Sequence, residues 1–244
     1  MDPRLARLEL KTSISSIADL VFPRFCVVCG IHLMPYEKHI CMDCEEDIPY
    51  TRYEKMSHNP MSDSFNALLA RQNFVGPYVH ATALFHYSGN YKEITRQLKY
   101  RRNFSAGKFF SRRFGERLKS SPLYEDVDTV VPVPLHWTRK WRRGYNQADI
   151  IAREISGILG AEFCPEALKR RRSTETQTRL SVSGRMENVS GAFVAGKPLR
   201  NASHILLVDD VYTTGSTLSV CHKALRETLP RKSRISVATI AFVE

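Results

Sequence analysis

The stretch LLVDDVYTTGSTL, residues 206–218, predicts a buried strand that opens into a loop and then a helix. Its start is continuously apolar, as in a parallel strand covered on both faces of a sheet. Asp209 and Asp210 end the strand, and a run of small hydroxyl residues surrounds Gly215. In open α/β sheets, ligands bind beyond the carboxyl ends of the strands. This stretch therefore indicates both the fold class and the edge of the sheet that would carry a site.

Strands and helices alternate along the rest of the chain. Apolar, β-branched runs predict strands at 81–88, 127–134, 203–211 and 234–243. Helical spacing of apolar residues predicts helices at 91–102, 104–120, 145–160 and 216–229, and a short amphipathic helix within residues 1–21. Polar residues at 55–64 favour a loop or linker. We therefore expect an α/β fold with a parallel sheet over residues 65–244, preceded by a small unit over residues 1–55.

Charge is concentrated in one part of the chain. The 244 residues carry a net charge of +11, and between Lys92 and Arg185 there are 21 Lys and Arg against 10 Asp and Glu. Such a local excess favours a phosphate-rich partner over a role in solubility alone. Neither a signal peptide nor an apolar run of about 20 residues is present, so we expect a cytoplasmic location without stable membrane insertion. The N-terminal helix would pack on its own protein or contact a membrane.

Cys26, Cys29, Cys41 and Cys44 form a C-x2-C-x11-C-x2-C pattern. Two such pairs that close together make a tetrahedral four-thiolate site, which is typical of structural zinc. A disulfide framework belongs to oxidising compartments, and a redox pair would not come in tandem. Since all four positions would be filled by sulfur, we expect the zinc to hold a small module folded and not to take part in catalysis.

The residues after the strand at 203–211 suit a sugar phosphate. Asp209 and Asp210 can accept hydrogen bonds from vicinal hydroxyls, as on a ribose. Backbone amides at the start of the following helix attract an anion, and Gly215 allows a close approach. The candidate anion cradle consists of Thr213, Thr214, Gly215, Ser216 and Thr217. The nucleotide-hydrolase pattern G-x-x-x-x-G-K-[ST] and the dinucleotide pattern G-x-G-x-x-G are both absent. A purely structural turn remains the alternative.

LLVDDVYTTGSTL resembles the signature with which type I phosphoribosyltransferases bind 5-phosphoribosyl 1-pyrophosphate (PRPP). The wider chain is similar to the ComF family of competence proteins. That resemblance rests on the cysteine pairs, on LKY at 98–100, on VVPVPLHWTRKWRRGYNQ at 130–147 and on TETQTRLSVSGRMENVSGAF at 174–193. Tyr145 stands where the family commonly has phenylalanine. The resemblance implies a phosphoribosyltransferase domain of type I over residues 65–244, with the zinc-binding module before it.

The resemblance also implies roles for individual residues. Asp209 and Asp210 would hold the ribose 2- and 3-hydroxyls, and residues 213–217 would bind the 5-phosphate. A pyrophosphate that carries Mg²⁺ would face Leu135, His136, Arg139, Lys140 and Arg142. Residues 170–188 look like a flap that closes over such sites. In an enzyme, pyrophosphate would leave C1 of the ribose and a nitrogen nucleophile would attack there. No residue is named as catalytic, and the acceptor, turnover, oligomeric state and protein partners stay open.

ComF proteins are associated with natural transformation, which implies a cytoplasmic role with imported single-stranded DNA, together with DNA-import or helicase proteins. Basic and aromatic residues alternate in 99–114, as in single-strand binding surfaces, although Phe109, Phe110 and Phe114 could equally belong to a core. The candidate DNA contacts are Lys99, Arg101, Arg102, Lys108, Arg112 and Arg113. A nucleotide-salvage phosphoribosyltransferase that acts on a small-molecule acceptor is the alternative function.

Overall fold

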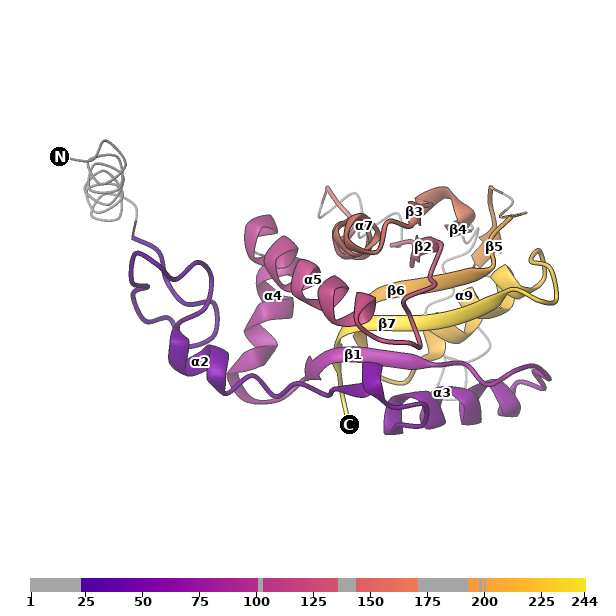
Figure 1. Ribbon diagram of the computed structural model, residues 1–244, viewed down its shortest axis with the longest axis horizontal. Helices are drawn as coiled ribbons and strands as arrows, with labels where there is room; N and C mark the ends of the chain where they lie inside the picture. Colours follow the sequence, from indigo (N-terminus) through magenta and orange to yellow (C-terminus); the bar gives the residue numbers. More distant parts are fainter. Residues whose placement is uncertain (1–22, 101–102, 136–143, 171–192, 198, 200) are drawn as a thin grey trace, which may run out of the picture.

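The computed structural model describes residues 23–100, 103–135, 144–170, 193–197, 199 and 201–244 (Figure 1). Its centre is a five-stranded sheet in the order β1-β7-β6-β2-β3, in which all neighbouring strands are parallel. The strands are β1 (Ala81–His86), β2 (Thr129–Pro132), β3 (Glu162–Phe163), β6 (His204–Tyr212) and β7 (Arg234–Phe242). The predicted parallel α/β architecture is confirmed.

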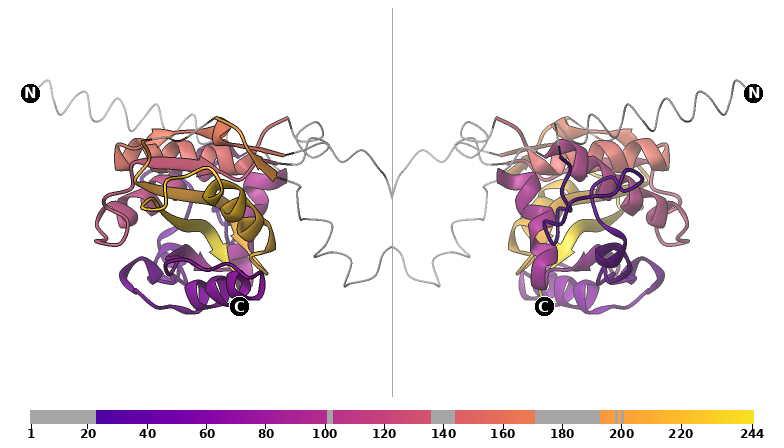
Figure 2. Two further views of the ribbon diagram at one scale, coloured as in Figure 1. Left: turned by 90° about the vertical axis from the view of Figure 1, so that its right-hand side faces the viewer. Right: turned by 90° about the vertical axis from the view of Figure 1, so that its left-hand side faces the viewer.

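Helices cover both faces of this sheet. They are α3 (Pro60–Arg71), α4 (Lys92–Tyr100), α5 (Phe104–Lys119), α7 (Gln147–Leu159) and α9 (Ser216–Arg226). In Figure 1, α5 and α7 lie above the sheet and α3 lies below it, while Figure 2 shows the same layers from the two ends. Three of these helices have a sequence signal at their start: the side chains of Asn59, Asn103 and Asn146 cap α3, α5 and α7.

Two hydrophobic cores lie on opposite faces of the sheet. Ile205 and Leu207 of β6 belong to the core with α3 and α9, whereas Leu206 and Val208 belong to the core with α5 and α7. This alternation follows from the two-residue period of a strand. Because both faces of β6 are buried, its hydrophobic run is continuous, and the strand is fixed in the middle of the sheet.

The segment before the sheet differs from the prediction at one point. The residues at 55–64 were expected to form a loop, but α3 begins at Pro60, with Asn59 as its capping residue. Proline at the first helical position and asparagine before it are both helix-start signals. The linker prediction is therefore wrong for residues 60–64. It was based on their polar composition and did not take the helix-start signal at Asn59 and Pro60 into account.

The remaining elements are short. Helix α2 (Met42–Glu46) follows the third cysteine, and 3-10 turns occupy Tyr53–Lys55, Gly89–Tyr91 and Pro165–Ala167. Strands β4 (Leu168–Arg170) and β5 (Phe193–Ala195) pair antiparallel. The predicted N-terminal helix and most of the predicted flap lie outside the described residues. Among the described helices, none has both the length and the hydropathy to cross a bilayer.

Candidate functional site

The aspartate pair lies at the carboxyl end of β6, the central strand of the sheet. Asp209 and Asp210 are both half-buried. The Asp210 amide donates to Asp209 Oδ1 at 2.8 Å, and Lys99 Nζ lies 3.1 Å from Asp210 Oδ2. Two carboxylates and one ammonium therefore meet at the edge of the sheet where α/β proteins bind ligands.

The electrostatics of this pair are unusual. Burial and the neighbouring charge of Asp210 raise the pKa of Asp209 to about 8. The hydrogen bond from the Asp210 amide and the positive charge of Lys99 oppose that rise. Without a ligand, the pair therefore retains a proton near neutral pH. A cation or several hydroxyl donors at this place would stabilise the doubly ionised pair.

The loop after β6 turns sharply into α9. Gly215, the residue before the helix, has a φ of 70°, in the left-handed region that favours glycine. A Cβ atom there would lie 2.7 Å from Tyr212 Oη. The hydroxyl oxygens of Thr214 and Ser216 lie 2.9 Å apart, and this contact is exposed to solvent. Glycine is thus required both by the backbone angle and by the packing of the tyrosine ring beneath.

The other residues of the predicted cradle lie in the same loop. Thr213 is exposed, and Thr217 is half-buried in the first turn of α9. The amides at the start of this helix have no partners within it, as at the start of any helix, and they attract anions. The structure thus brings the carboxylate pair and an amide-rich helix start together within one strand–loop–helix unit.

The predicted pyrophosphate side can be located in part. Strand β2 pairs with β6 through Pro132 and Val208, so the chain beyond β2 continues toward the edge that carries Asp209. Leu135 follows there and is half-buried. The other four residues of the predicted set, His136, Arg139, Lys140 and Arg142, lie outside the described residues. The same holds for the predicted flap from residue 171 onward, whereas Arg170 in β4 pairs with Phe193 in β5.

Two residues that were not predicted as site residues support the position of Lys99. The Tyr145 hydroxyl donates to the Leu98 carbonyl, and its ring packs edge-on against Phe104 at 4.7 Å. Asn146 donates to the Val133 carbonyl at 3.0 Å. The start of α7 is thereby tied to the end of α4 and to the loop after β2. Asn146 could have been predicted from the sequence as the capping residue of α7. The contact of the Tyr145 hydroxyl could not, because it depends on how α4 and α7 pack.

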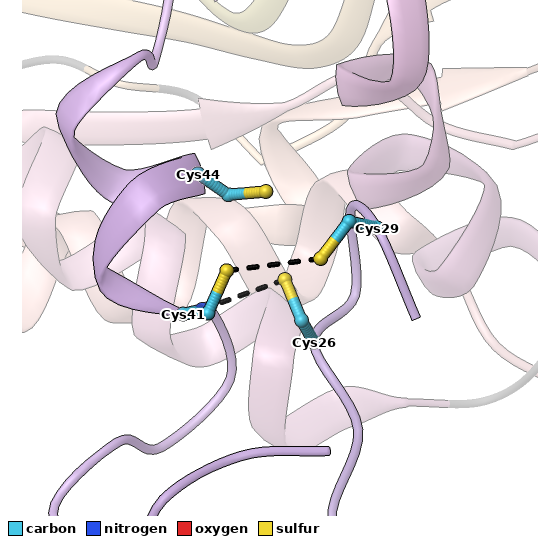
Figure 3. Close-up of side chains that lie close together, drawn as sticks. All are labelled: Cys26, Cys29, Cys41 and Cys44. Carbon is cyan, nitrogen blue, oxygen red and sulfur yellow. Dashed lines mark hydrogen bonds between the residues drawn. The ribbon is translucent and has the colours of Figure 1, made fainter. Parts of the chain in front are cut away.

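The four cysteines gather at one place, as Figure 3 shows. All four Sγ atoms lie within 4.8 Å of one another, and those of Cys29 and Cys41 are 3.7 Å apart. Zinc–sulfur bonds of about 2.3 Å in a tetrahedron place the sulfur atoms about 3.8 Å apart. The cluster therefore has the donor atoms and the spacing to bind a metal ion such as zinc.

The pKa values of the thiols in this cluster also fit a site that binds a cation. Burial raises the pKa of the Cys26 thiol, but backbone hydrogen bonds from Cys29, Cys41 and Val28 outweigh it and lower the pKa to about 7. The pKa of Cys44 is raised, first by burial and then by the neighbouring thiols. Four thiols this close cannot all ionise unless a positive ion compensates their charge.

The cysteine segment packs on α4 and α5, on the left in Figure 1. Tyr91 donates to the Cys44 carbonyl at 2.8 Å, and Arg113 pairs with Glu45 at 2.5 Å. The Arg113 guanidinium also lies over the Phe109 ring, 4.5 Å from its centre. Arg113, one of the predicted DNA contacts, thus connects the cysteine segment to α5.

The other predicted DNA contacts are dispersed. Lys108 and Arg112 are exposed on α5, and Lys108 is 3.9 Å from Glu154. Lys99 pairs with Asp210, while Arg101 and Arg102 lie outside the described residues. Phe110 and Phe114 are buried in the core. Of the two alternatives for these rings, base stacking or core packing, the structure therefore supports core packing. Phe104 and Phe109 of the segment are partly buried.

Comparison with curated proteins gives relatives along most of the chain. "Competence protein F" of Haemophilus influenzae is 28% identical over 211 residues, which cover 84% of this chain and 80% of that protein. "Competence protein ComFC" of Bacillus subtilis is 27% identical over 220 residues, 89% of this chain and 77% of that protein. "DNA utilization protein YhgH" of Escherichia coli is 42% identical over 92 residues, 38% of this chain and 40% of that protein.

No protein-family model matches the chain. Each of the two long matches covers more than four fifths of the chain. Together, the relatives named Competence protein F, ComFC and YhgH support the assignment of this chain to the ComF family.

Proposed function

We propose that this protein binds PRPP and acts in natural transformation, where it handles imported single-stranded DNA. The observation that carries the first part is the unit formed by Asp209, Asp210 and the glycine turn into α9. Carboxylates would accept hydrogen bonds from the ribose hydroxyls, while the amides and hydroxyls of residues 213–217 would bind the 5-phosphate. A bare phosphate would be repelled by the acid pair, so a sugar phosphate fits better.

Mg²⁺ would accompany the pyrophosphate and neutralise charge as that group leaves. The residues of this chain would do the rest: the acid pair orients the ribose, and the loop after β2 faces the leaving group. Lys99 would be displaced from Asp210 or would move toward the ligand, because the ribose and the ammonium compete for the same carboxylate.

The names of the relatives support the second part, since two are called competence proteins and the third a DNA utilization protein. The charge excess between Lys92 and Arg185 is consistent with a nucleic-acid backbone as partner. In this proposal, structural zinc at the four cysteines braces residues 1–55 against the phosphoribosyltransferase-like domain at 65–244. Exposed Lys108 and Arg112 on α5 are the described candidates for phosphate contacts.

Fluorescence anisotropy with a labelled single strand tests the DNA part. We expect the affinity to fall steeply with added salt, because each phosphate contact releases a counterion. The double variant Lys108→Gln/Arg112→Gln should bind more weakly, and its affinity should depend less steeply on salt. The control is Lys55→Gln/Lys119→Gln, which removes the same charge at two other exposed positions. Absence of binding even at low salt would favour a nucleotide-salvage phosphoribosyltransferase.

A further inference from the structure

A cavity lies at the amino ends of the strands, at the opposite end of the sheet from the aspartate pair. It adjoins the amino ends of β1 and β7, and its volume is about 60 Å³. These two strand ends lie on the right in Figure 1. Aromatic, apolar and basic side chains line it, among them Phe74, Tyr78, His80, His222, Arg226 and Arg234. No carboxylate is among the lining residues, although two arginines are.

Arg226 contributes a positive charge that has no counter-ion among the described residues. Its guanidinium is half-buried and donates to the backbone carbonyls of Ser233 and Pro230. Burial lowers the pKa of this group, because the charged form is partly desolvated. A guanidinium has five donors, so further N–H groups stay available after these two bonds. A partly desolvated cation of this kind is stabilised by an anion.

The acid that pairs with Arg234 at the cavity rim has two partners. Asp126 pairs with His204 Nδ1 at 2.7 Å and also with Arg234. Arg234 is therefore neutralised, whereas Arg226 is not. The uncompensated positive charge of the cavity thus comes from Arg226, and the imidazoles of His80 and His222 add polar nitrogens to the lining.

His222 provides a second, independent sign of a ligand. Its side chain is only 2% exposed, its ring packs edge-on against Phe74 at 4.9 Å, and its buried Nδ1 has no hydrogen-bond partner within the described residues. Burial and then the charge of Arg226 lower the pKa of this imidazole to about 4, so the ring is neutral and carries one N–H. Buried polar atoms without a partner are rare in native proteins and indicate a missing ligand or water.

We propose that this cavity binds a small oxyanion of the size of a phosphate group, held by Arg226 and His222. At roughly 10–15 Å³ for each water, a cavity of this size holds about four, which is close to the five heavy atoms of phosphate. Because the cavity lies at the amino ends of the strands and Asp209 at a carboxyl end, this proposal does not rest on PRPP binding at Asp209.

The test is a titration with orthophosphate, read at the imidazole nitrogens by ¹H–¹⁵N NMR. A ring signal at this cavity distinguishes the site from phosphate bound at residues 213–217. We expect the His222 signals to shift on titration, and the affinity to fall about tenfold or more in Arg226→Gln, a change of at least about 1.4 kcal/mol. Arg231→Gln, which removes an exposed arginine from the adjacent loop, should bind as the wild type does.

A second variant keeps the proposal testable if Arg226→Gln is poorly folded. His222→Phe preserves the aromatic packing and removes the ring nitrogens, and His80 then serves as the reporter. Loss of the phosphate-dependent His80 shift in this variant supports the site; an unchanged shift overturns it, as does a wild-type His222 signal that ignores phosphate. Adenosine 5′-monophosphate, used as a second probe, shows whether a nucleotide phosphate enters or whether only the free anion fits.

Discussion

The Lys99 ammonium lies 3.1 Å from Asp210 Oδ2, so the last turn of α4 supplies the counter-charge for the acid pair at the end of β6. The two residues are more than a hundred positions apart in the sequence, and both are largely shielded from water. This contact links the helix that follows β1 to the candidate PRPP site. It also means that the ligand-free protein holds the aspartates in a charge-compensated state.

Replacing Lys99 by methionine removes that compensation while it keeps the aliphatic stem. We expect the free energy of unfolding at pH 8 to fall by about 1–3 kcal/mol, because Asp210 is left partly buried without its partner. Chemical denaturation measures this. Lys108→Met is the matched control: its ammonium is exposed and 3.9 Å from Glu154, so the loss should stay below about 1 kcal/mol. Equal stability of the two variants would contradict the role given to Lys99.

The raised pKa of Asp209 predicts a pH dependence of stability with a definite sign. The folded protein keeps a proton on this carboxyl up to about pH 8, whereas the unfolded chain releases it near pH 3.8, the ordinary pKa of an aspartate. Stability therefore falls as the pH rises through this window, with a slope of at most about 1.4 kcal/mol per pH unit from this group.

Asp209→Asn removes the titrating group and should flatten this slope, so the variant gains stability over the wild type as the pH increases from 4 to 8. Denaturation curves at several pH values measure the difference. The lowered pKa values of His204 and His222 act in the opposite direction at acid pH, but they cancel in the comparison. Parallel pH profiles for the variant and the wild type would show that Asp209 does not hold the proton.

Gly215→Ala should weaken both the turn and the ligand cradle. The left-handed backbone and the contact of a new Cβ with Tyr212 predict a loss of about 1–3 kcal/mol in unfolding free energy, together with weaker phosphate binding. Gly157→Ala is the control, because that glycine lies within α7 with open space around it. There we expect a gain of about 0.5–1 kcal/mol. The account of the turn fails if both variants change stability alike.

The candidate metal centre predicts one metal ion per chain. Cys44→Ser should lower the metal content measured by elemental analysis after purification with zinc, and it should loosen the cysteine segment, because the metal stabilises a segment with little core of its own. Cys164→Ser changes a buried cysteine outside the cluster and should leave the metal content as it is. Retention of the full metal content in Cys44→Ser would exclude the four-thiolate site.

The sequence predicted the features that depend on local pattern. The apolar run of β6 placed Asp209 and Asp210 at the sheet edge, and the cysteine spacing predicted a cluster that the structure shows. Features that depend on packing between distant segments were missed. The pair of Lys99 with Asp210 carried no sequence signal, since only the fold brings α4 over β6.

The aromatic residues of α5 illustrate the same limit. A basic and aromatic alternation fits a stacking surface and an amphipathic helix equally well, and the spacing of Phe110 and Phe114 by four residues puts both on the face that packs into the core. The cavity at His222 carried no sequence signal at all, because its lining comes from the loop after α3, from α9 and from β7.

The most direct test of the central claim is isothermal titration calorimetry with PRPP and Mg²⁺ on the wild type and on Asp209→Asn/Asp210→Asn. Asp43→Asn/Asp47→Asn, which neutralises two exposed acids by α2, is the matched control. We predict that the wild type and the control bind PRPP alike, and that the site variant binds at least about tenfold more weakly, a loss of about 1.4 kcal/mol or more. Equal affinity in all three proteins would contradict the assignment of the acid pair to the ribose.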